Sequence, residues 1–335
     1  MKILRDGNCK CCFFVWQWLR WNLGLKTSYQ EFYDFYLNQD TKDKIILDLK
    51  ECIKTNRETW SDLERQLGEF TQEINTQQEL DLAILDLVRN LRLYLSEIEQ
   101  NIVYSKFNRD MLLNDLANPE RVMSARDQRD VNSFKQKFKG NDKHLIHILS
   151  FNYTKVVENI LDGNHSNLEI SKSSNRVARL QGVEHIHGYV NQRLVLGLND
   201  KNQIANPDFR DSQDTMELLV KPAHNEQLGH LRDDFCFDRI SKATMIYIFG
   251  SSIGETDKIW WEAVGKRVGQ HCCLVIYYRG KNTDENTEIL EARRGRDLVT
   301  HFLSLTNLDD RQKEKAREYI YTATTKDLFK LTKST

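Results

Sequence analysis

The 335-residue sequence is poor in proline, lacks long apolar runs and carries almost no net charge. Only three prolines occur, which favours long uninterrupted helices, because proline breaks a helix in its interior. No run of about 18 apolar residues is present, so we expect no membrane-spanning helix. The 48 basic residues nearly balance the 49 acidic ones, so bulk charge gives no indication of nucleic-acid binding.

The cysteines are few and irregularly placed. Their number, seven, is odd, so we expect no disulfide framework and a reducing, cytoplasmic environment. The CxCC group near the N-terminus has no second ligand pair nearby, so we predict no metal site. A signal peptide is not expected either, because Asp6, Gln17 and Arg20 interrupt the N-terminal apolar stretch and no small-residue cleavage site follows.

The first third of the chain has helical periodicity. In SYQEFYDFYL four aromatic residues recur at the spacing of one helix face, and QQELDLAILDLVRNLRLYLSEIEQNI repeats leucine and isoleucine over a longer span. The region 120–142 is polar and is typical of a linker or a solvated helix. We therefore predict a helical insertion or cap over residues 28–142.

The character of the sequence changes near residue 143. The apolar runs HLIHILS, VEHIHGYV, RLVLGL, ATMIYIF and CCLVIYY predict buried strands with helices between them, and RQKEKAREYIYTA predicts a terminal helix. Buried strands that alternate with helices indicate an α/β fold with a parallel sheet and helices on both faces. We predict this core over residues 143–307 and a C-terminal helix and tail over residues 308–335. The first strand and its loop are expected within residues 1–27.

The segments that leave the strands carry the candidate site residues, because ligands bind beyond the carboxyl ends of strands in open α/β sheets. The first such segment is SFNYT, with Phe151, Asn152 and Tyr153. The carboxamide of Asn152 offers both a hydrogen-bond donor and an acceptor there. The alternative is an ordinary helix N-cap formed by asparagine or threonine, and this segment taken alone favours it.

The second segment is HIHG, with His185, His187 and Gly188. A histidine before a glycine at a strand end can place an imidazole in a cleft, where it acts as a base near neutral pH. A buried structural histidine is the alternative. A metal site is weakly indicated, because side chains two apart on a strand share a face but no third ligand is suggested.

The third segment is FGSSIGETD, with Gly250, Ser251, Ser252 and Asp257. Small residues let the backbone approach a ligand closely. The two serines can bond ribose or phosphate, and the helix N-terminus that follows favours anions. A tight turn capped by Thr256 or Asp257 is the alternative interpretation.

The succession of strand, SFNYT, helix, HG, strand, GSS and helix resembles the sirtuin-like NAD-binding domains. The segments NLGLKTSYQEFYDFYL, LSFNYTKVVE, HIHG and FGSSIGETDKIWWE are also similar to the AbiH family of bacterial phage-defence proteins, over residues 22 to 307. The resemblance implies a sirtuin-like, Rossmann-like fold with a large helical insertion. It also implies NAD as a substrate or ligand, with no membrane involved.

The resemblance further implies roles for the candidate residues. Asn152 would contact the nicotinamide ribose or hold the attacking water, and His187 would be the base. Cofactor contacts would come from the other candidates, which are Phe151, Tyr153, Gly188, Gly250, Ser251, Ser252 and Asp257.

A phage-defence protein that hydrolyses NAD to nicotinamide and ADP-ribose follows from this resemblance. Deacylation is not expected, because the four-cysteine zinc module of sirtuins is missing. The alternative is a non-catalytic nucleotide-sensing or partner-binding module whose helical insertion recognises a phage component or forms an oligomer. A nuclease would need clustered carboxylates, and the adjacent pairs at 233–234 and 309–310 are typical of solvated surface.

The N-terminus departs from the family pattern. Family members look as if they begin with a hydrophobic strand, Gly-Asn-Gly-Phe-Asp and a Leu-Gly-Leu stretch, whereas here VWQWLRW stands where the middle motif belongs. Back-translated and read one base later, VWQWLRW permits Gly-Asn-Gly-Phe-Asp. We infer that residues 5–21 are a frameshifted translation; the alternative is a genuine segment rich in cysteine and tryptophan. Without the glycine-rich loop, we expect the chain as written to bind NAD weakly and to be inactive.

Overall fold

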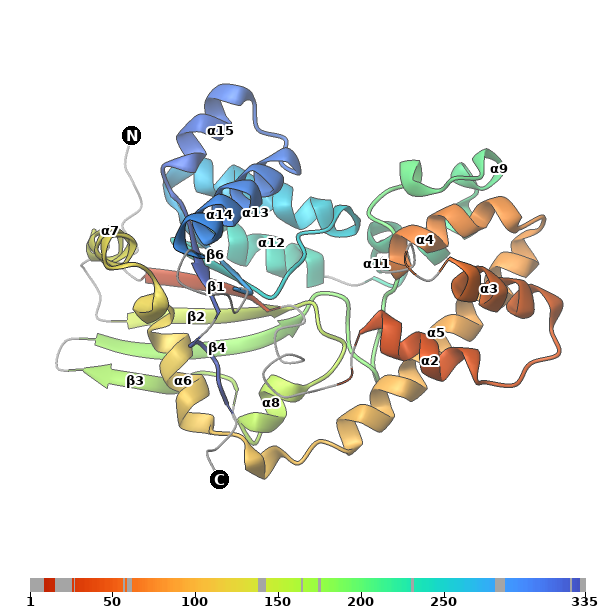
Figure 1. The fold of residues 1–335 in the computed structure, drawn as a ribbon, viewed down its shortest axis with the longest axis horizontal. Helices are drawn as coiled ribbons and strands as arrows, with labels where there is room; N and C mark the ends of the chain where they lie inside the picture. The colour runs from red at the N-terminus through yellow and green to blue at the C-terminus, as the bar shows by residue number, and fades with distance from the viewer. Residues whose placement is uncertain are drawn as a thin grey trace.

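A central β-sheet with a group of helices at one end forms the molecule (Figure 1). The computed structural model describes residues 9–15, 26, 28–56, 58, 62–137, 143–163, 165–173, 176–229, 232–280, 287–325 and 327–331. None of the described helices is both long enough and apolar enough to span a bilayer. Four cysteines of the described part are buried, namely Cys11, Cys236, Cys272 and Cys273, and Cys52 is half-buried.

The sheet has seven strands in the order β3-β4-β2-β1-β5-β6-β7. Only the β3–β4 pair is antiparallel. Numbered by themselves along the chain, the six parallel strands run 3-2-1-4-5-6, the order of doubly wound dinucleotide-binding sheets. The predicted α/β fold is therefore confirmed, and the predicted parallel pairing holds for every pair of strands except β3 and β4. The strands are β1 Cys9–Val15, β2 Lys143–Ser150, β3 Leu168–Ser173, β4 Arg176–His185, β5 Met245–Phe249, β6 Cys273–Tyr278 and β7 Ile320–Thr324.

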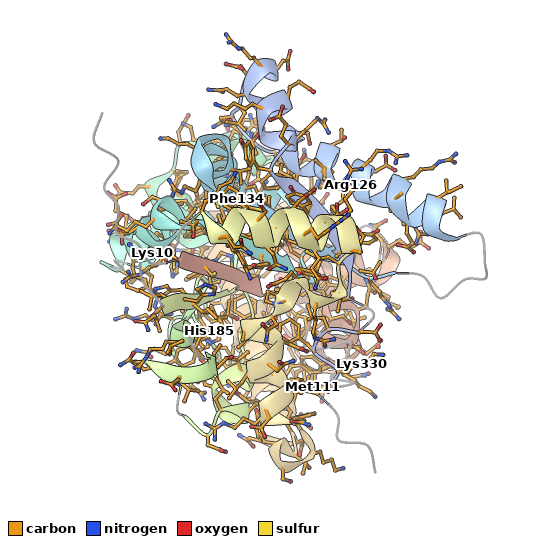
Figure 2. All side chains as sticks on the ribbon, turned by 90° about the vertical axis from the view of Figure 1, so that its left-hand side faces the viewer. Lys10, Met111, Arg126, Phe134, His185 and Lys330 are labelled. Atoms are coloured by element: carbon orange, nitrogen blue, oxygen red, sulfur yellow. The ribbon has the colours of Figure 1, made fainter. Side chains whose placement is uncertain are left out.

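Both faces of the sheet are covered by helices, because successive side chains of a strand point to opposite faces. In β5, Tyr247 and Phe249 belong to the core on one face, whereas Ile246 and Ile248 belong to the core on the other. This two-sided burial explains why the strand reads as a continuous apolar run. Figure 2 faces the side that carries α6, labelled by Met111, and α7, labelled by Phe134.

Each face of the sheet is covered by its own layer of helices. On the first face lie α6 Arg109–Ala117, α7 Ala125–Gln136 and α8 Val156–Ile160. On the second face lie α12 Arg232–Lys242, α13 Lys258–His271, α14 Thr287–Ser304 and α15 Asp310–Arg317. Short 3-10 helices connect the longer elements at η2 Thr71–Glu73, η3 Tyr104–Lys106, η4 Pro119–Val122, η5 Lys201–Gln203 and η6 Glu255–Asp257.

A separate helical cap lies at the end of the sheet toward which the parallel strands run (Figure 1). It has its own apolar core, built from two stretches of chain that are far apart in the sequence. Helices α6 and α7 lie within residues 28–142 but pack on the sheet and not in this cap. The cap consists of α2 Tyr29–Leu37, α3 Lys44–Thr55, α4 Leu63–Phe70, α5 Gln77–Gln100, α9 Pro207–Arg210, α10 Gln213–Leu219 and α11 Lys221–Gln227.

Two local predictions are wrong. The RLVLGL segment forms no strand: its leucines, Leu194, Leu196 and Leu198, pack into the cap core, and its one bridge joins Leu198 to Val220. An apolar run marks any buried extended chain, and this one lacks a sheet partner. RQKEKAREYIYTA is helical only to Arg317, since the residues after it form β7 beside β6. Aromatic and β-branched residues favour this sheet edge.

The first strand lies in the range assigned to a frameshift. Strand β1 occupies the middle of the sheet, where Cys11 pairs with Ile146 of β2 and with Met245 of β5. The rest of the tryptophan-rich run, in residues 16–25, lies outside the described residues. The frameshift therefore stays a prediction, and so does the proposed loss of the glycine-rich loop.

Candidate functional site

The three segments singled out in the sequence meet at one edge of the sheet. Strand β2 is parallel to its neighbours β4 and β1, and β1 is parallel to β5. The carboxyl ends of β2, β4 and β5 therefore lie at the same edge of the sheet. The backbone N–H of Ile186 donates to the carbonyl of Ser150 at 2.8 Å. His187 contacts Asp257 at 2.7 Å, which joins the segment after β4 to the segment after β5.

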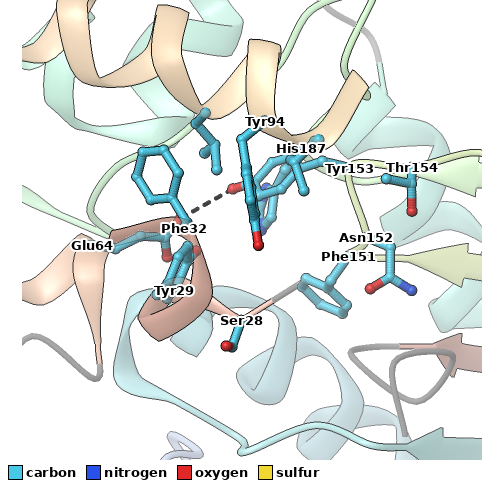
Figure 3. A pocket seen from close by; sticks show the side chains of 12 residues that line it. Ser28, Tyr29, Phe32, Glu64, Tyr94, Phe151, Asn152, Tyr153, Thr154 and His187 are labelled. Atoms are coloured by element: carbon cyan, nitrogen blue, oxygen red, sulfur yellow. Dashed lines mark hydrogen bonds between the residues drawn. The ribbon is translucent and has the colours of Figure 1, made fainter. Parts of the chain in front are cut away.

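A cavity lies between this edge and the cap (Figure 3). Its volume is about 60 Å³, and it opens to solvent. Asn152 and His187, which are far apart along the chain, both line it, together with Phe151 and Tyr153. Its remaining lining residues are Thr154 from the sheet edge and Ser28, Tyr29, Phe32, Glu64, Leu91, Tyr94 and Leu95 from the cap.

The cap residues are placed by well-defined helix starts. Ser28 caps α2 in a capping box with Glu31, which fixes Tyr29 at the first helical position. Asp62 caps α4 and accepts a hydrogen bond from the Arg65 backbone. This places the acidic Glu64 in the first turn, where the helix dipole favours a negative charge.

The ring of His187 is fixed at one nitrogen and lacks a partner at the other. Its Nε2 lies 2.7 Å from Oδ1 of Asp257, and a carboxylate can only accept, so Nε2 carries a proton and donates it. Nδ1 is buried and has no hydrogen-bond partner among the described residues. In the neutral ring this nitrogen holds a lone pair that can take up a proton. Phe151 packs edge-on against the ring at 5.3 Å between centroids.

A buried ion cluster supports His187 from behind. The ammonium of Lys221 donates to Asp257 Oδ1 at 2.9 Å, to Glu64 Oε2 at 2.7 Å and to the carbonyl of Thr256 at 3.2 Å. Lys221, Glu64, Asp257 and His187 are each at most 4% exposed. Isolated charges at such depth are costly, so each needs its partners.

Burial and pairing shift the ionisation of this cluster. Burial alone would raise the pKa of Asp257, but the charges of Lys221 and His187 and their hydrogen bonds hold it below its ordinary value. Burial raises the pKa of Glu64 in spite of Lys221. Burial would lower the pKa of Lys221, but the charges of Asp257 and Glu64 raise it above its usual range. Tyr153, beside Glu64, stays a neutral phenol, because burial raises its pKa strongly.

His185 holds the Asn152 segment and does not line the cavity. Its Nδ1 donates to the backbone carbonyl of Asn152 at 2.6 Å, and its Nε2 lies 2.7 Å from Oε1 of Glu158. Burial would raise the pKa of Glu158, but the hydrogen bond and charge of His185 lower it. The backbone N–H of Lys155 donates to Glu99 at 2.7 Å, which ties the same segment to the end of α5.

Two turns require unusual backbone conformations. Gly188 has a φ of +71°, and a Cβ there would lie 1.7 Å from the carbonyl oxygen of Arg193. Gly250 has a φ of +63°, and Ile253 has a φ of +53°, which is strained for a β-branched residue. The hydroxyl of Ser251 accepts from the Ile253 backbone at 2.9 Å. His301 bonds the Ile253 carbonyl at 2.9 Å and so helps to hold the strained turn.

The third segment lies beside the cavity and not in its wall. Gly250 and Ser252 are exposed and Ser251 is half-buried. All three follow the end of β5, which lies next to β1. That position is where the strand order reverses, the usual place of a nucleotide crevice. Their contacts with a cofactor stay a prediction, as does any contact made by Asp257, which is buried under His187.

Sequence reasoning missed the contribution of the cap. Glu64, Lys221, Tyr29 and Tyr94 were not predicted, because nothing in a helical pattern shows which face meets a distant strand end. One weak signal exists in ELLVKPAH, where a single lysine stands in an apolar run before a proline. Proline is favoured in the first turn of a helix, and α11 begins at Lys221.

Together the fold and the site define an α/β protein whose helical cap covers a polar cavity at the carboxyl edge of a mostly parallel sheet. A sequence model of the family described as bacteriophage abortive infection AbiH matches residues 21–278. The chain therefore belongs to the AbiH family, and that part of the resemblance is confirmed. No curated protein matches the chain. Within the described residues, no group of three or more histidine, cysteine, aspartate or glutamate side chains is suited to hold a metal ion.

Proposed function

We propose that this AbiH protein acts in phage defence by hydrolysing NAD to nicotinamide and ADP-ribose. The family description supports the defence role. One observation carries the chemistry: the carboxamide of Asn152 and the imidazole of His187 line one cavity, and a buried carboxylate orients the imidazole. A sirtuin-like core is part of this proposal, supported by the strand order and by the succession of motifs.

In this proposal His187, Asp257 and Asn152 have different roles in the hydrolysis. Nδ1 of His187 accepts a proton from water while the water oxygen bonds to the anomeric carbon of the ribose. The bond to nicotinamide breaks, and its electron pair leaves with nicotinamide. Asp257 holds the ring in place and stabilises the imidazolium that forms. Asn152 positions the water or the ribose hydroxyls, and positioning of this kind lowers the barrier.

The remaining contacts follow from the edge of the sheet. Phe151 and Tyr153 form aromatic walls of the cavity. Gly188 follows His187 and does not line the cavity, so its contact with the cofactor is part of the proposal. The turn with Gly250, Ser251 and Ser252 would bond ribose or phosphate where the strand order reverses. In the family pattern a glycine-rich motif supplies further phosphate contacts, so its missing small residues would weaken binding in the chain as written.

The test is nicotinamide release from NAD, measured with the chain as written and with a chain whose reading frame is restored. In the restored chain we expect Asn152→Ala and His187→Ala each to slow release by about 10²- to 10⁴-fold. His144→Ala, at the far end of β2, and the exposed Asn101→Ala are controls that should retain activity. Unchanged release in both site variants would refute the proposal.

A non-catalytic nucleotide-sensing or partner-binding module is the rival function. Thermal unfolding with and without NAD separates the two in combination with the release assay. A rise in melting temperature without nicotinamide release would favour the sensing module over the enzyme.

A further inference from the structure

Lys221 occupies an unusual position for a lysine, since its ammonium is buried and all three of its N–H groups have acceptors. Those acceptors are Glu64 from the cap, Asp257 from the segment after β5, and the backbone carbonyl of Thr256. Lys221 itself is the first residue of a cap helix. A single side chain therefore links the cap to the group that holds His187.

The same cluster sets the electric field at the His187 ring. Oδ1 of Asp257 accepts from both Lys221 and His187, and the ammonium of Lys221 lies 3.5 Å from Nε2 of the ring. At this distance and depth a unit charge acts strongly on its neighbour. The ammonium opposes a second proton on the ring, whereas the carboxylate of Glu64 favours one.

The charge near the ring comes from three side chains of the described part of the chain. Asp257 and Lys221 lie against Nε2, and Glu64 pairs with Lys221. Tyr153 and Tyr29 complete the polar surroundings, and burial raises the pKa of both phenols, so they remain neutral. The balance of one ammonium against two carboxylates therefore controls how readily Nδ1 takes up a proton.

We propose that Lys221 and Glu64 are positioning residues through which the cap sets the protonation of His187. Lys221 holds Asp257 against Nε2 and keeps Nδ1 free to accept a proton, and Glu64 anchors Lys221. The use of Nδ1 as a base rests on the proposed function. The electrostatic effect of the cap on the ring does not depend on it.

The experiment is ¹⁵N NMR of protein labelled at its nine histidines, with the His187 signals assigned by their loss in His187→Gln. Spectra are recorded at the pH where the wild-type ring shows its singly and doubly protonated forms in equal amounts. In Lys221→Met we expect the doubly protonated fraction to rise to about nine-tenths, roughly a tenfold change in the ratio of the two forms. In Glu64→Gln we expect it to fall well below half.

The opposite signs separate positioning from a merely structural role. Both substitutions break the same ion pair, so simple loosening of the cap would change the ring in the same direction in both variants. Lys201→Met is the matched control, because Lys201 pairs with Asp211 at 2.6 Å on the surface of the same cap; the fractions should not change. Shifts in the same direction in the two variants, or none in either, would overturn the proposal.

Folding of the variants is checked by thermal unfolding. If Lys221→Met does not fold, Lys221→Arg keeps the positive charge and should leave the two forms in equal amounts, while Glu64→Gln still gives its own signed result. No change of the ring in Glu64→Gln would then be enough to overturn the inference.

Nicotinamide release supplies a second readout that stays separate from the first. In an active chain, Lys221→Met should lose activity at neutral pH and regain it as the pH is raised, whereas His187→Ala should not recover. If no variant releases nicotinamide, the proposed function fails while the NMR result still decides the inference. If release occurs but the ring is unaffected, the inference alone fails.

Discussion

Two histidines two positions apart have different roles, and the difference arises from their contacts. His185 ends β4 and is enclosed between a backbone carbonyl and Glu158. His187 lies past the strand end and lines the cavity, and its Nδ1 has no partner among the described residues. The sequence made both histidines candidates, because an isolated HIHG motif does not show which imidazole lies beside a cavity.

The backbone conformation of Gly188 predicts the effect of a substitution on stability. Gly188→Ala should lower the free energy of unfolding by about 2–5 kcal/mol, because left-handed strain of about 1–2 kcal/mol adds to a backbone clash. Gly163 has a similar φ of +75°, but a Cβ added there would meet none of the described residues within 4 Å. Gly163→Ala should therefore show the strain alone. Urea unfolding measures both, and equal losses would contradict the steric argument.

The sequence pattern of a strand predicts the strand itself, but the elements packed against it change the pKa of its side chains. Strand β2 presents His147 on the face that α12 partly covers, where the ring is half-buried. Burial lowers the pKa of His147 to about 4, and the charges of Arg239 and Lys10 add to the effect against a weaker contribution from Asp238. The folded strand therefore holds this ring neutral.

A pH dependence of stability follows from His147. In the unfolded chain this histidine has an ordinary pKa of about 6.5. Between about pH 6.5 and about pH 4 the unfolded chain therefore binds a proton at His147 that the folded chain does not bind. Stability is therefore present above pH 6.5 and is lost as the pH falls toward 4. His147→Gln cannot titrate and should flatten the fall in urea midpoint between about pH 7 and about pH 5. An identical fall in the wild type and the variant would show that other groups dominate.

The molecule as a whole is a sheet and a cap that share one cavity. The cap is assembled from stretches before β2 and after β4, so its core and its ion cluster form only when both stretches pack together. The cavity is likewise shared, because its walls come from three cap helices and two segments of the sheet edge. Neither part has the complete site by itself.

The N-terminus gives a prediction for the whole chain. If residues 5–21 result from a frameshift, the intact mass of the protein from its native source will differ from that of the written sequence, and resequencing will show the shifted frame. The restored loop after β1 should also strengthen NAD binding. A mass that matches the written sequence would show that the segment rich in cysteine and tryptophan is made.

Much of the fold was readable from local pattern. Apolar runs and helical periodicity predicted the buried strands β2, β5 and β6 and the cap helices before β2, because burial of a face imposes a period on the sequence. The cap helices α9, α10 and α11 were not predicted. Two strands were missed: β3 has mixed polarity, and β7 directly follows a charged helix. The local sequence pattern does not show which strands pair with each other. Short strands at the edge of a sheet can therefore be identified only from the strand beside them.

The sequence by itself determined the strands β2, β5 and β6, the helical periodicity of residues 28–107, the segments that leave the strands and the resemblance to AbiH proteins. Only the tertiary structure decided the strand order, the enclosure of His185, the partner of His187 and the presence of Lys221 behind it. The reason is the distance along the chain: Asp257 is 70 positions from His187, and Lys221 is 157 positions from Glu64. Contacts of that range are selected by the packing of whole elements, and no local spacing encodes them.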